Sequence, residues 1–589
     1  MHRLALAAMF SAVCVGTAGA QQALTTNQRD ADFTLLAGTF AKQYAPYEWK
    51  RDVFGFDLLR LTPWLQRVHK TDDLDFEEAL VDYIASLNDA HVTISFPSNF
   101  SASLGFTVDI YDGKALIDSV NRVALPAAQF PFGVGDELVA LDGQPVQSVI
   151  ASLRKYAVAA NPRPTDRLAA GYVTDRFQQI MPHAPAVPDT SVVTVRLAAT
   201  GAVNGYRIPW TKTGIGLASQ GPVPSPRRGN GKIFLPPGQT TTAETSVGGV
   251  GPARVRPANA AGGDALPAYL DPIRPLLDVS IATRPNAVLG FGARSPVFGL
   301  PAGFSLRLGT QASHFFFSGT YLSNGVRIGF IRIPTMSPPN ATLALQQLDQ
   351  EIAFFNANTD VLVVDVTRNP GGSVNVTEAF AQRLFTSAFH SVGFEIRATA
   401  AWVDSIVRAV MSAQAAGAPP DVVQNLRAIM DEIIAAYNEN RGRTAPVSLT
   451  TGNLTLDPAP NGYSKPILLL VDEMTASGGD MFAAMLQDNH RGPLFGMRTM
   501  GAGGSVFNFY CTAFTESLCS ITASLMNRGV TISGTEFPSS PYIENVGVRP
   551  DIVVDYMTRA NLMSAGAPFV QAFTAAAVGL TQVPAVPHQ

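Results

Sequence analysis

The sequence predicts a multidomain α/β protein, in which a helical N-terminal region and a β-rich domain precede an α/β domain. Three observations support this fold class: apolar residues at helical spacing up to about residue 90, strand-like alternation over 92–146, and alternating strand and helix patterns after about residue 300. Hydrophobic residues make up 46% of the 589 residues and charged residues only 15%. That composition indicates a folded chain with room for two to four domains.

The chain begins with a stretch typical of a secretory signal peptide. "MHRLALAAMFSAVCVGTAGA" has a basic Arg3, an apolar run and an Ala-Gly-Ala ending at Ala20. We therefore predict a signal peptide over residues 1–20, with cleavage before Gln21. No other stretch is apolar for long enough to span a bilayer, so we expect a secreted protein, periplasmic or extracellular, with no membrane span.

The two cysteines that remain after Cys14 is removed lie eight residues apart, in "FNFYCTAFTESLCSITASL". Strand-like runs flank a polar turn, and an exported protein matures in an oxidising compartment. We predict a disulfide between Cys511 and Cys519 that closes a hairpin. Two buried free thiols are the alternative.

Several classes of function are disfavoured by composition or by missing motifs. A net charge of −4 without a long basic run does not indicate binding to nucleic acid or to an anionic membrane. There is no His-Glu-x-x-His or Cys-x-x-Cys, so we expect no metal and no cofactor. Thr475 stands where the Gly-x-Ser-x-Gly motif of an α/β-hydrolase has its first glycine.

The β-rich region resembles a PDZ module. "SLGF" (103–106) is similar to the loop whose backbone amides hold a peptide carboxylate, and "GDELVALDGQPV" (135–146) is similar to a late PDZ hairpin. The resemblance implies that Leu104, Gly105 and Phe106 contact a peptide that binds by strand addition. Turns of the second kind also occur in sheets that bind nothing.

These patterns divide the chain into five predicted parts. The insertion is rich in Gly, Pro, Ser and Thr and is longer than an ordinary loop, which favours a mobile segment. Its Arg227-Arg228 pair is a candidate cleavage site, and a solvated linker is the alternative. The parts are a signal peptide (1–20), an N-terminal helical subdomain (21–98), a PDZ-like domain (99–212), the insertion (213–300) and an α/β domain (301–589).

Within the α/β domain, apolar strands alternate with helical patterns, as in a sheet covered on both faces. A helical excursion over 396–443 interrupts the alternation and could form a lid or a dimer arm. The predicted strands are 325–334, 360–367, 466–471 and 551–556, and the predicted helices are 341–357, 375–389, 403–440 and 478–489.

The stretch "VDEMTASGGDMFAAMLQDN" (471–489) places Ser477 between a buried strand and a helix. A serine at such a corner is a candidate nucleophile. However, Asp480 completes a Ser-x-x-Asp pattern, which is also typical of a helix cap. Taken alone, the stretch leaves both interpretations open.

Three segments in order resemble one family, the C-terminal-processing and tricorn-type serine peptidases. They are "VLVVDVTRNPGGSV" (361–374), the Ser477 stretch and "LFGMRTMGAGGSV" (494–506). The resemblance implies an α/β catalytic domain of the tail-specific, ClpP/crotonase-like type, with Ser477 as nucleophile. It also implies protein or peptide substrates and a homodimer.

The chain departs from the processing peptidases at their general base. That base is a lysine 25 residues after the serine, where this sequence has Ala502, and no lysine follows Lys465. The tricorn-like branch instead uses a histidine N-terminal to its PDZ part. "LNDAHVTISF" (87–96) resembles that element, which implies that His91 is the base.

The third catalytic residue also comes from resemblance. "YIENVGVRPDIVVDY" (542–556) is similar to the closing segment of the chlamydial protease-like activity factor group, in which a glutamate completes Ser-His-Glu. Glu544 matches this glutamate, and Glu536 is the second choice. Tricorn has a serine just before its histidine, where this chain has Ala90, so its four-residue arrangement is not reproduced.

The implied mechanism assigns a role to each element. His91 removes the Ser477 proton, while the Gly478 amide and an amide of Gly371 or Gly372 stabilise the oxyanion. The group forms zymogens, which implies that cleavage within 213–300 activates the enzyme. The alternative function is a catalytically inactive PDZ-containing protein that binds a peptide or another ligand on the same scaffold.

Overall fold

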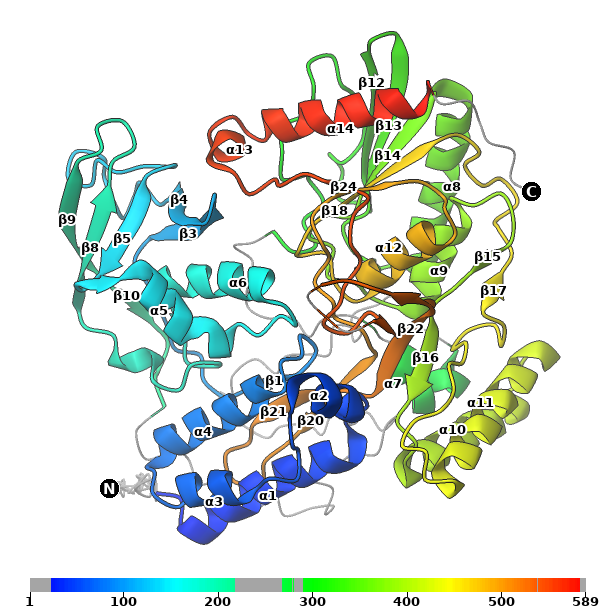
Figure 1. Ribbon diagram of the computed structural model, residues 1–589, viewed down its shortest axis with the longest axis horizontal. Coiled ribbons are helices and arrows are strands. Elements are labelled where there is room, and N and C mark those ends of the chain that lie inside the picture. Colours follow the sequence, from blue (N-terminus) through cyan, green and yellow to red (C-terminus); the bar gives the residue numbers. More distant parts are fainter. Residues whose placement is uncertain are drawn as a thin grey trace, which may run out of the picture.

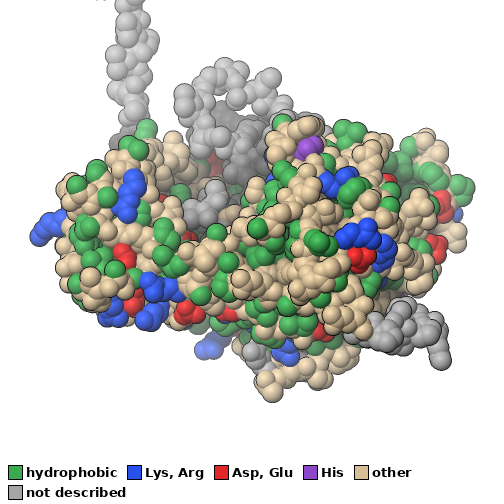
Figure 2. Space-filling view, turned by 90° about the horizontal axis from the view of Figure 1, so that it is seen from above, with side chains coloured by type: hydrophobic (Ala, Val, Ile, Leu, Met, Phe, Trp, Pro, Cys, Tyr) green, Lys and Arg blue, Asp and Glu red, His purple; other side chains and the backbone are tan. Residues whose placement is uncertain are grey.

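The computed structural model describes residues 23–217, 267–277, 279, 290–535, 537 and 539–582 (Figure 1). The predicted signal peptide, the Arg227-Arg228 pair and Glu536 lie outside the described residues. Helices at the N-terminus, a PDZ domain and a large α/β domain follow one another along the chain, as predicted. No helix among the described residues is long and apolar enough to cross a membrane. On the face seen in Figure 2, Lys and Arg side chains lie among Asp and Glu side chains.

The N-terminal region is helical, and it delivers His91 to the α/β domain. Its last helix begins at an Asp72 cap, whose side chain accepts a hydrogen bond from the Asp75 amide, and it buries Phe76 and Leu80. A short turn through His91 then leads into strand β1. The elements are α1 (Thr26–Gln43), α2 (Tyr47–Phe54), α3 (Thr62–Val68), α4 (Asp73–Ser86) and β1 (Thr93–Ser95).

Strand β1 pairs with a hairpin from the other end of the chain. It lies antiparallel to β21 (Leu518–Thr522), which pairs with β20 (Val506–Tyr510). The predicted disulfide between Cys511 and Cys519 closes this hairpin, with Cα atoms 5.6 Å apart. Because β21 also contacts β1, the disulfide supports the strand that follows His91.

Loss of the disulfide should destabilise the protein. Closing so short a loop restricts the unfolded chain, which corresponds to about 2.5 kcal/mol in the chain-entropy estimate. We expect urea denaturation to show a loss of this size when reductant is added. A Cys511→Ala/Cys519→Ala double variant should show the same stability with and without reductant. Equal stability of the reduced and oxidised wild-type chain would contradict the prediction.

The PDZ domain consists of two small sheets and two helices. The larger sheet has the order β3-β4-β5-β8-β9, with β6 paired to β5. Its strands are β3 (Phe106–Tyr111), β4 (Lys114–Val120), β5 (Glu137–Leu141), β6 (Gln144–Pro145), β8 (Thr190–Arg196) and β9 (Val203–Pro209). The remaining elements are β2 (Ser101–Ser103), β7 (Asp175–Phe177), β10 (Thr211–Thr213), α5 (Val146–Leu153), η1 (Arg154–Tyr156), α6 (Pro162–Thr174) and η2 (Ala184–Ala186).

The α/β domain is built on a sheet whose described strands have the order β11-β12-β13-β14-β18-β19-β24. The strands from β13 to β24 are parallel, and β11 and β12 are antiparallel. The last strand is shorter than the predicted 551–556, because the chain after it turns toward the PDZ domain, where Asp555 pairs with Arg163. The strands are β11 (Ser305–Leu308), β12 (Phe317–Ser323), β13 (Val326–Arg332), β14 (Val361–Asp365), β18 (Ile467–Val471), β19 (Leu494–Gly496) and β24 (Ile552–Val553).

Helices cover both faces of this sheet (Figure 1). Leu362 and Val364 of β14 belong to the core on one face, and Val361 and Val363 belong to the core on the other. This explains why the central strands read as continuous apolar runs. Helices α8 (Ala341–Asn358), α9 (Val374–Gln382) and α12 (Gly478–Asp488) lie on one side, and α14 (Ala567–Leu580) lies on the other, after α13 (Arg559–Met563).

Two predicted helices were too long. The one predicted over 375–389 ends at Gln382, after which the Phe385 and Phe389 rings stack with centroids 4.0 Å apart. The stretch predicted over 403–440 is two helices, because Gly417 takes φ 66° and two prolines follow. They are α10 (Ala400–Ala415) and α11 (Pro420–Asn438), next to β15 (Phe389–His390), β16 (Gly393–Ile396), β17 (Thr455–Leu456), β22 (Ser524–Ile532) and β23 (Ser540–Tyr542).

The predicted insertion over 213–300 is not a uniformly structureless segment. Its residues 267–277 form η3 (Ala268–Ile273) and α7 (Arg274–Leu277), and η3 packs against α10. Ile273, Leu276 and Leu277 are buried in the core of the α/β domain. Their helical spacing gives this short piece an apolar face, which explains why it packs.

Candidate active site

The structure places Ser477 on a strained turn between β18 and α12. Its backbone has φ 57° and ψ −115°, a conformation that a residue with a side chain adopts only at a cost. The Ser477 amide donates to Asp480 Oδ2 at 2.7 Å, and the Ala476 amide donates to the Asn369 carbonyl at 2.9 Å. The helix-cap interpretation of Asp480 is therefore correct, and it coexists with a functional position for the serine side chain.

Asp480 also holds the nucleophile turn against the glycine-rich segment. Besides the Ser477 amide, it accepts hydrogen bonds from the Gly501 amide at 3.0 Å, the Ala502 amide at 3.1 Å and the Thr499 hydroxyl. Burial raises the pKa of this carboxyl to about 6, although each of these hydrogen bonds lowers it. Ala502 stands where the processing peptidases have their lysine, and its backbone amide helps to hold Asp480 in place.

His91 lies directly against the serine hydroxyl. Its Nε2 is 2.8 Å from Ser477 Oγ, and both side chains are fully buried. The backbone around the histidine is fixed, because its amide donates to Asp89 Oδ1 at 2.8 Å and its carbonyl accepts from Ser520 Oγ at 2.6 Å. The arrangement can therefore transfer a proton between a hydroxyl and an imidazole.

Glu544 lies in the same buried region and is held through both of its oxygens. Oε1 is 2.5 Å from Lys50 Nζ, and Oε2 accepts from the Gly503 amide at 3.0 Å. Burial, and then the charge of Asp89, raise the pKa of Glu544, while Lys50 and the Gly503 amide oppose this rise. Asp89 Oδ1 accepts from the His91 amide, so the charge that raises the pKa of Glu544 lies on the turn that carries His91.

The predicted oxyanion glycines meet at the serine. A Cβ added at Gly371, where φ is 90°, would lie 2.5 Å from the Gly478 nitrogen, and one added at Gly478 would lie 3.0 Å from the Gly372 nitrogen. The Gly371 amide already donates to Asn369 Oδ1 at 2.8 Å. Of the two alternatives that the sequence left open, the geometry therefore favours Gly372 as the partner of Gly478.

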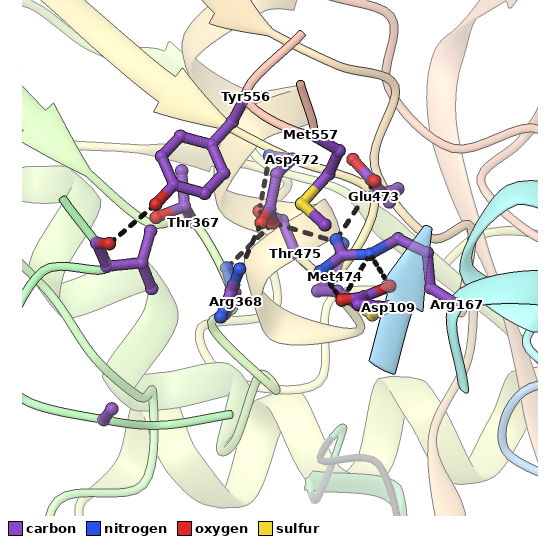
Figure 3. Close-up of polar contacts among 12 residues, drawn as sticks. Asp109, Arg167, Thr367, Arg368, Asp472, Glu473, Met474, Thr475, Tyr556 and Met557 are labelled. Atoms are coloured by element: carbon purple, nitrogen blue, oxygen red, sulfur yellow. Dashed lines mark hydrogen bonds and ion pairs between the residues drawn. The ribbon is translucent and has the colours of Figure 1, made fainter. Parts of the chain in front are cut away.

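A buried network below the nucleophile turn joins it to the PDZ domain (Figure 3). Arg167 of α6 is 2.6 Å from Asp109 Oδ2 on β3 and 3.0 Å from Glu473 Oε1. Asp472, next to Glu473, accepts from the Arg368 amide at 2.8 Å and the Met474 amide at 3.1 Å. One arginine thus connects a PDZ strand to the loop that precedes the serine.

Replacing Arg167 by methionine should destabilise the fold strongly. It would leave Asp109 and Glu473 buried with their shared cation removed, and breaking a buried pair costs about 3–5 kcal/mol. Urea denaturation measures this loss. The control is Arg163→Met, since Arg163 also contacts Glu473 but its side chain is 37% exposed, and its loss should cost clearly less. Equal effects of the two changes would contradict the prediction.

The PDZ loop predicted to hold a peptide carboxylate forms contacts within its own domain. The Leu104 amide donates to the Thr174 carbonyl of α6 at 3.0 Å, and the Gly105 amide donates to Ser103 Oγ at 3.1 Å. The side chains of Leu104 and Phe106 are buried. In this arrangement the loop is bound to α6, so peptide binding by these three residues stays a prediction.

Sequence comparison identifies the class of the protein. Residues 327–554 match the family model of peptidase family S41, and residues 100–214 match that of a PDZ domain. The chain thus contains a peptidase family S41 domain preceded by a PDZ domain, and it is a serine-type peptidase.

Individual relatives support the predicted family. A protein of Chlamydia trachomatis serovar D is 26% identical over 559 residues, which cover 88% of this chain and 87% of the relative. A carboxyl-terminal-processing protease of Synechocystis is 29% identical over 126 residues, 21% of this chain and 25% of the relative. The crystal structure of mature CPAF shares the fold, with a TM-score of 0.70 and 22% identity over 95% of this chain and 98% of that one. The predicted relationship is confirmed.

One residue of this region escaped the sequence analysis. The processing peptidases have their lysine after the serine. The lysine that contacts Glu544 here is Lys50, which lies far upstream in α2. Nothing in "YEWKRDVF" distinguishes Lys50 from its exposed neighbour Arg51. Only the fold reveals it.

Proposed function

We propose that this chain is a secreted serine endopeptidase that hydrolyses peptide bonds in protein substrates through Ser477, His91 and Glu544. The observation that carries the proposal is the 2.8 Å contact between His91 Nε2 and Ser477 Oγ at a strained turn. His91 takes the hydroxyl proton as Ser477 Oγ attacks the carbonyl carbon, and it later gives this proton to the leaving amine. Water then hydrolyses the acyl-enzyme by the same route.

The remaining residues stabilise the charges that form. The Gly478 amide, at the N-terminus of α12, and the neighbouring Gly372 amide would stabilise the negative charge that forms on the carbonyl oxygen of the substrate. Glu544 carries the negative charge that favours the imidazolium form of His91. Its fixed position between Lys50 and Gly503 supports that role.

We also propose that cleavage within residues 213–300 activates the enzyme. The Val279 amide donates to the Gly372 carbonyl at 2.7 Å, and a Cβ added at Gly478 would lie 3.2 Å from a Val279 methyl. This part of the insertion therefore lies beside the oxyanion glycines, where the backbone of a substrate would bind. Cutting the chain would allow this segment to leave.

The pH dependence of peptide hydrolysis tests the catalytic proposal. His91 acts as a base only when neutral, so kcat/KM should rise with pH through an apparent pKa of about 6.5. It is measured on an activated sample with a fluorogenic peptide derived from a protein that the enzyme cuts. Activity that appears only in the alkaline range would contradict a histidine base.

Incubation of the pure chain tests activation. New N-termini should appear within 213–300 as activity increases, and a Ser477→Ala chain should stay intact if the cleavage is autocatalytic. Full activity of a chain that remains uncut would contradict this part of the proposal.

A further inference from the structure

A buried lysine from the N-terminal helices contacts Glu544. Lys50 Nζ lies 2.5 Å from Glu544 Oε1, 2.5 Å from Asn545 Oδ1 and 2.8 Å from the Asn88 carbonyl. Its side chain is only 1% exposed. Lys50 therefore donates three hydrogen bonds to two segments, the turn that precedes His91 and the segment that carries Glu544.

The surroundings of Lys50 are built to hold its charged end in one place. Trp49 Nε1 donates to the same Asn545 oxygen at 3.1 Å, and Asn545 Nδ2 donates to the Asn88 and Ala160 carbonyls at 2.8 and 2.9 Å. Burying an ammonium group is costly unless it is paired. An apolar side chain would fill the same space without that cost, so packing alone does not explain a lysine here.

The electrostatics of Glu544 explain what the cation contributes. The charged and titratable groups around it are Asp89, Lys50 and Tyr44, and the Tyr44 hydroxyl donates to Asp89 Oδ2 at 2.8 Å. Burial and Asp89 both favour a protonated Glu544, and Lys50 opposes them. A protonated glutamic acid is neutral, so it would not stabilise an imidazolium on His91.

We propose that Lys50 is a positioning residue of the hydrolysis reaction, which opposes the protonation of Glu544 and holds this side chain beside the turn that leads to His91. Helix α2 thereby completes the active site of a domain that begins some 250 residues later in the chain. This inference rests on the proposed function, because it requires His91 to be the base and Glu544 to act on it.

The test is the pH profile of kcat/KM for Lys50→Met in the activated full chain. Without the cation Glu544 holds its proton to higher pH, so kcat at pH 7 should fall at least roughly tenfold with little change in KM. The pH range over which kcat/KM rises should move to higher pH by about one unit or more. Lys50→Arg, which keeps the charge, should restore most of the activity and the original pH range.

Three further variants separate this role from a structural one. Lys114→Met removes an exposed lysine beside Glu137 and should leave the profile unchanged. Lys50→Gln, which retains a polar end without charge, should show the same shift and replaces Lys50→Met if that chain does not fold. In a Glu544→Gln background, Lys50→Met should move this pH range no further, since no carboxylate remains to be kept ionised.

If kcat/KM of the Lys50→Met chain rises over the same pH range as that of the wild type, the inference is overturned, whether the rate is unchanged or uniformly lowered. That result differs from a failure of the proposed function. If the proposed function fails, kcat/KM of the wild-type chain itself would not rise with pH near the pKa of an imidazole.

Discussion

Replacing Ser477 by alanine should lower kcat/KM for peptide hydrolysis by at least roughly a thousandfold. The change removes the only atom that forms the acyl-enzyme, so just the contribution of binding and of the oxyanion amides remains. His91→Ala should cost a similar factor, because an unactivated hydroxyl is a weak nucleophile. The double variant should be no worse than either single one, since the two residues act as a unit.

The Ser477→Ala variant should fold, because replacing a serine at a helix cap costs only about 1 kcal/mol. The matched control for the histidine is His183→Ala: its ring is 43% exposed and pairs with Asp75 at 2.8 Å, away from the nucleophile. It should keep the wild-type rate. A His91→Ala chain that hydrolyses the peptide as fast as the wild type would contradict the assignment of the base.

The second large effect is expected for Gly371→Ala. At φ 90° a side chain is strained, and its Cβ would lie 2.5 Å from the Gly478 nitrogen and 2.7 Å from Ser477 Cβ. The backbone must shift at the residue that carries the nucleophile and at the amide of the oxyanion donor. Loss of one such donor costs roughly 10²- to 10³-fold in kcat, and we expect a loss at least that large.

Gly143→Ala is the control for this experiment. Gly143 has a similar φ of 79°, but a Cβ added there meets nothing within 4 Å. It should therefore show the backbone strain as a modest loss of thermal stability, with kcat unchanged. Kinetics on activated samples of both variants make the comparison. A Gly371→Ala chain with wild-type kcat would contradict the geometry of the oxyanion site.

The sequence was informative where chemistry requires a local pattern. A strand, a tight turn with Ser477 and a helix must be contiguous in the chain, and the glycine loop at 371–372 is equally local. His91 could be found only by resemblance, because it lies 386 residues from the serine that it contacts. The disulfide was predictable from the spacing of the two cysteines and from the predicted export of the chain.

The role of Lys50 was not predictable, because it depends on a contact with Glu544, which lies 494 residues away in the sequence. The same holds for Arg167, which reads as an ordinary helical residue until Asp109 and Glu473 surround it. The break of the long helical excursion at Gly417, in contrast, was visible in the Gly-x-Pro-Pro sequence and was missed. The apolar residues at helical spacing on both sides of Gly417 favoured one continuous helix.

Whether His91 activates Ser477 can be measured with a fluorophosphonate probe. The probe phosphonylates an activated serine, and mass spectrometry of the digested protein locates the adduct. In an activated sample, we expect an adduct on the peptide that contains Ser477 and almost none in His91→Ala. Labelling of a different serine, or equal labelling of Ser477 with and without His91, would contradict this expectation.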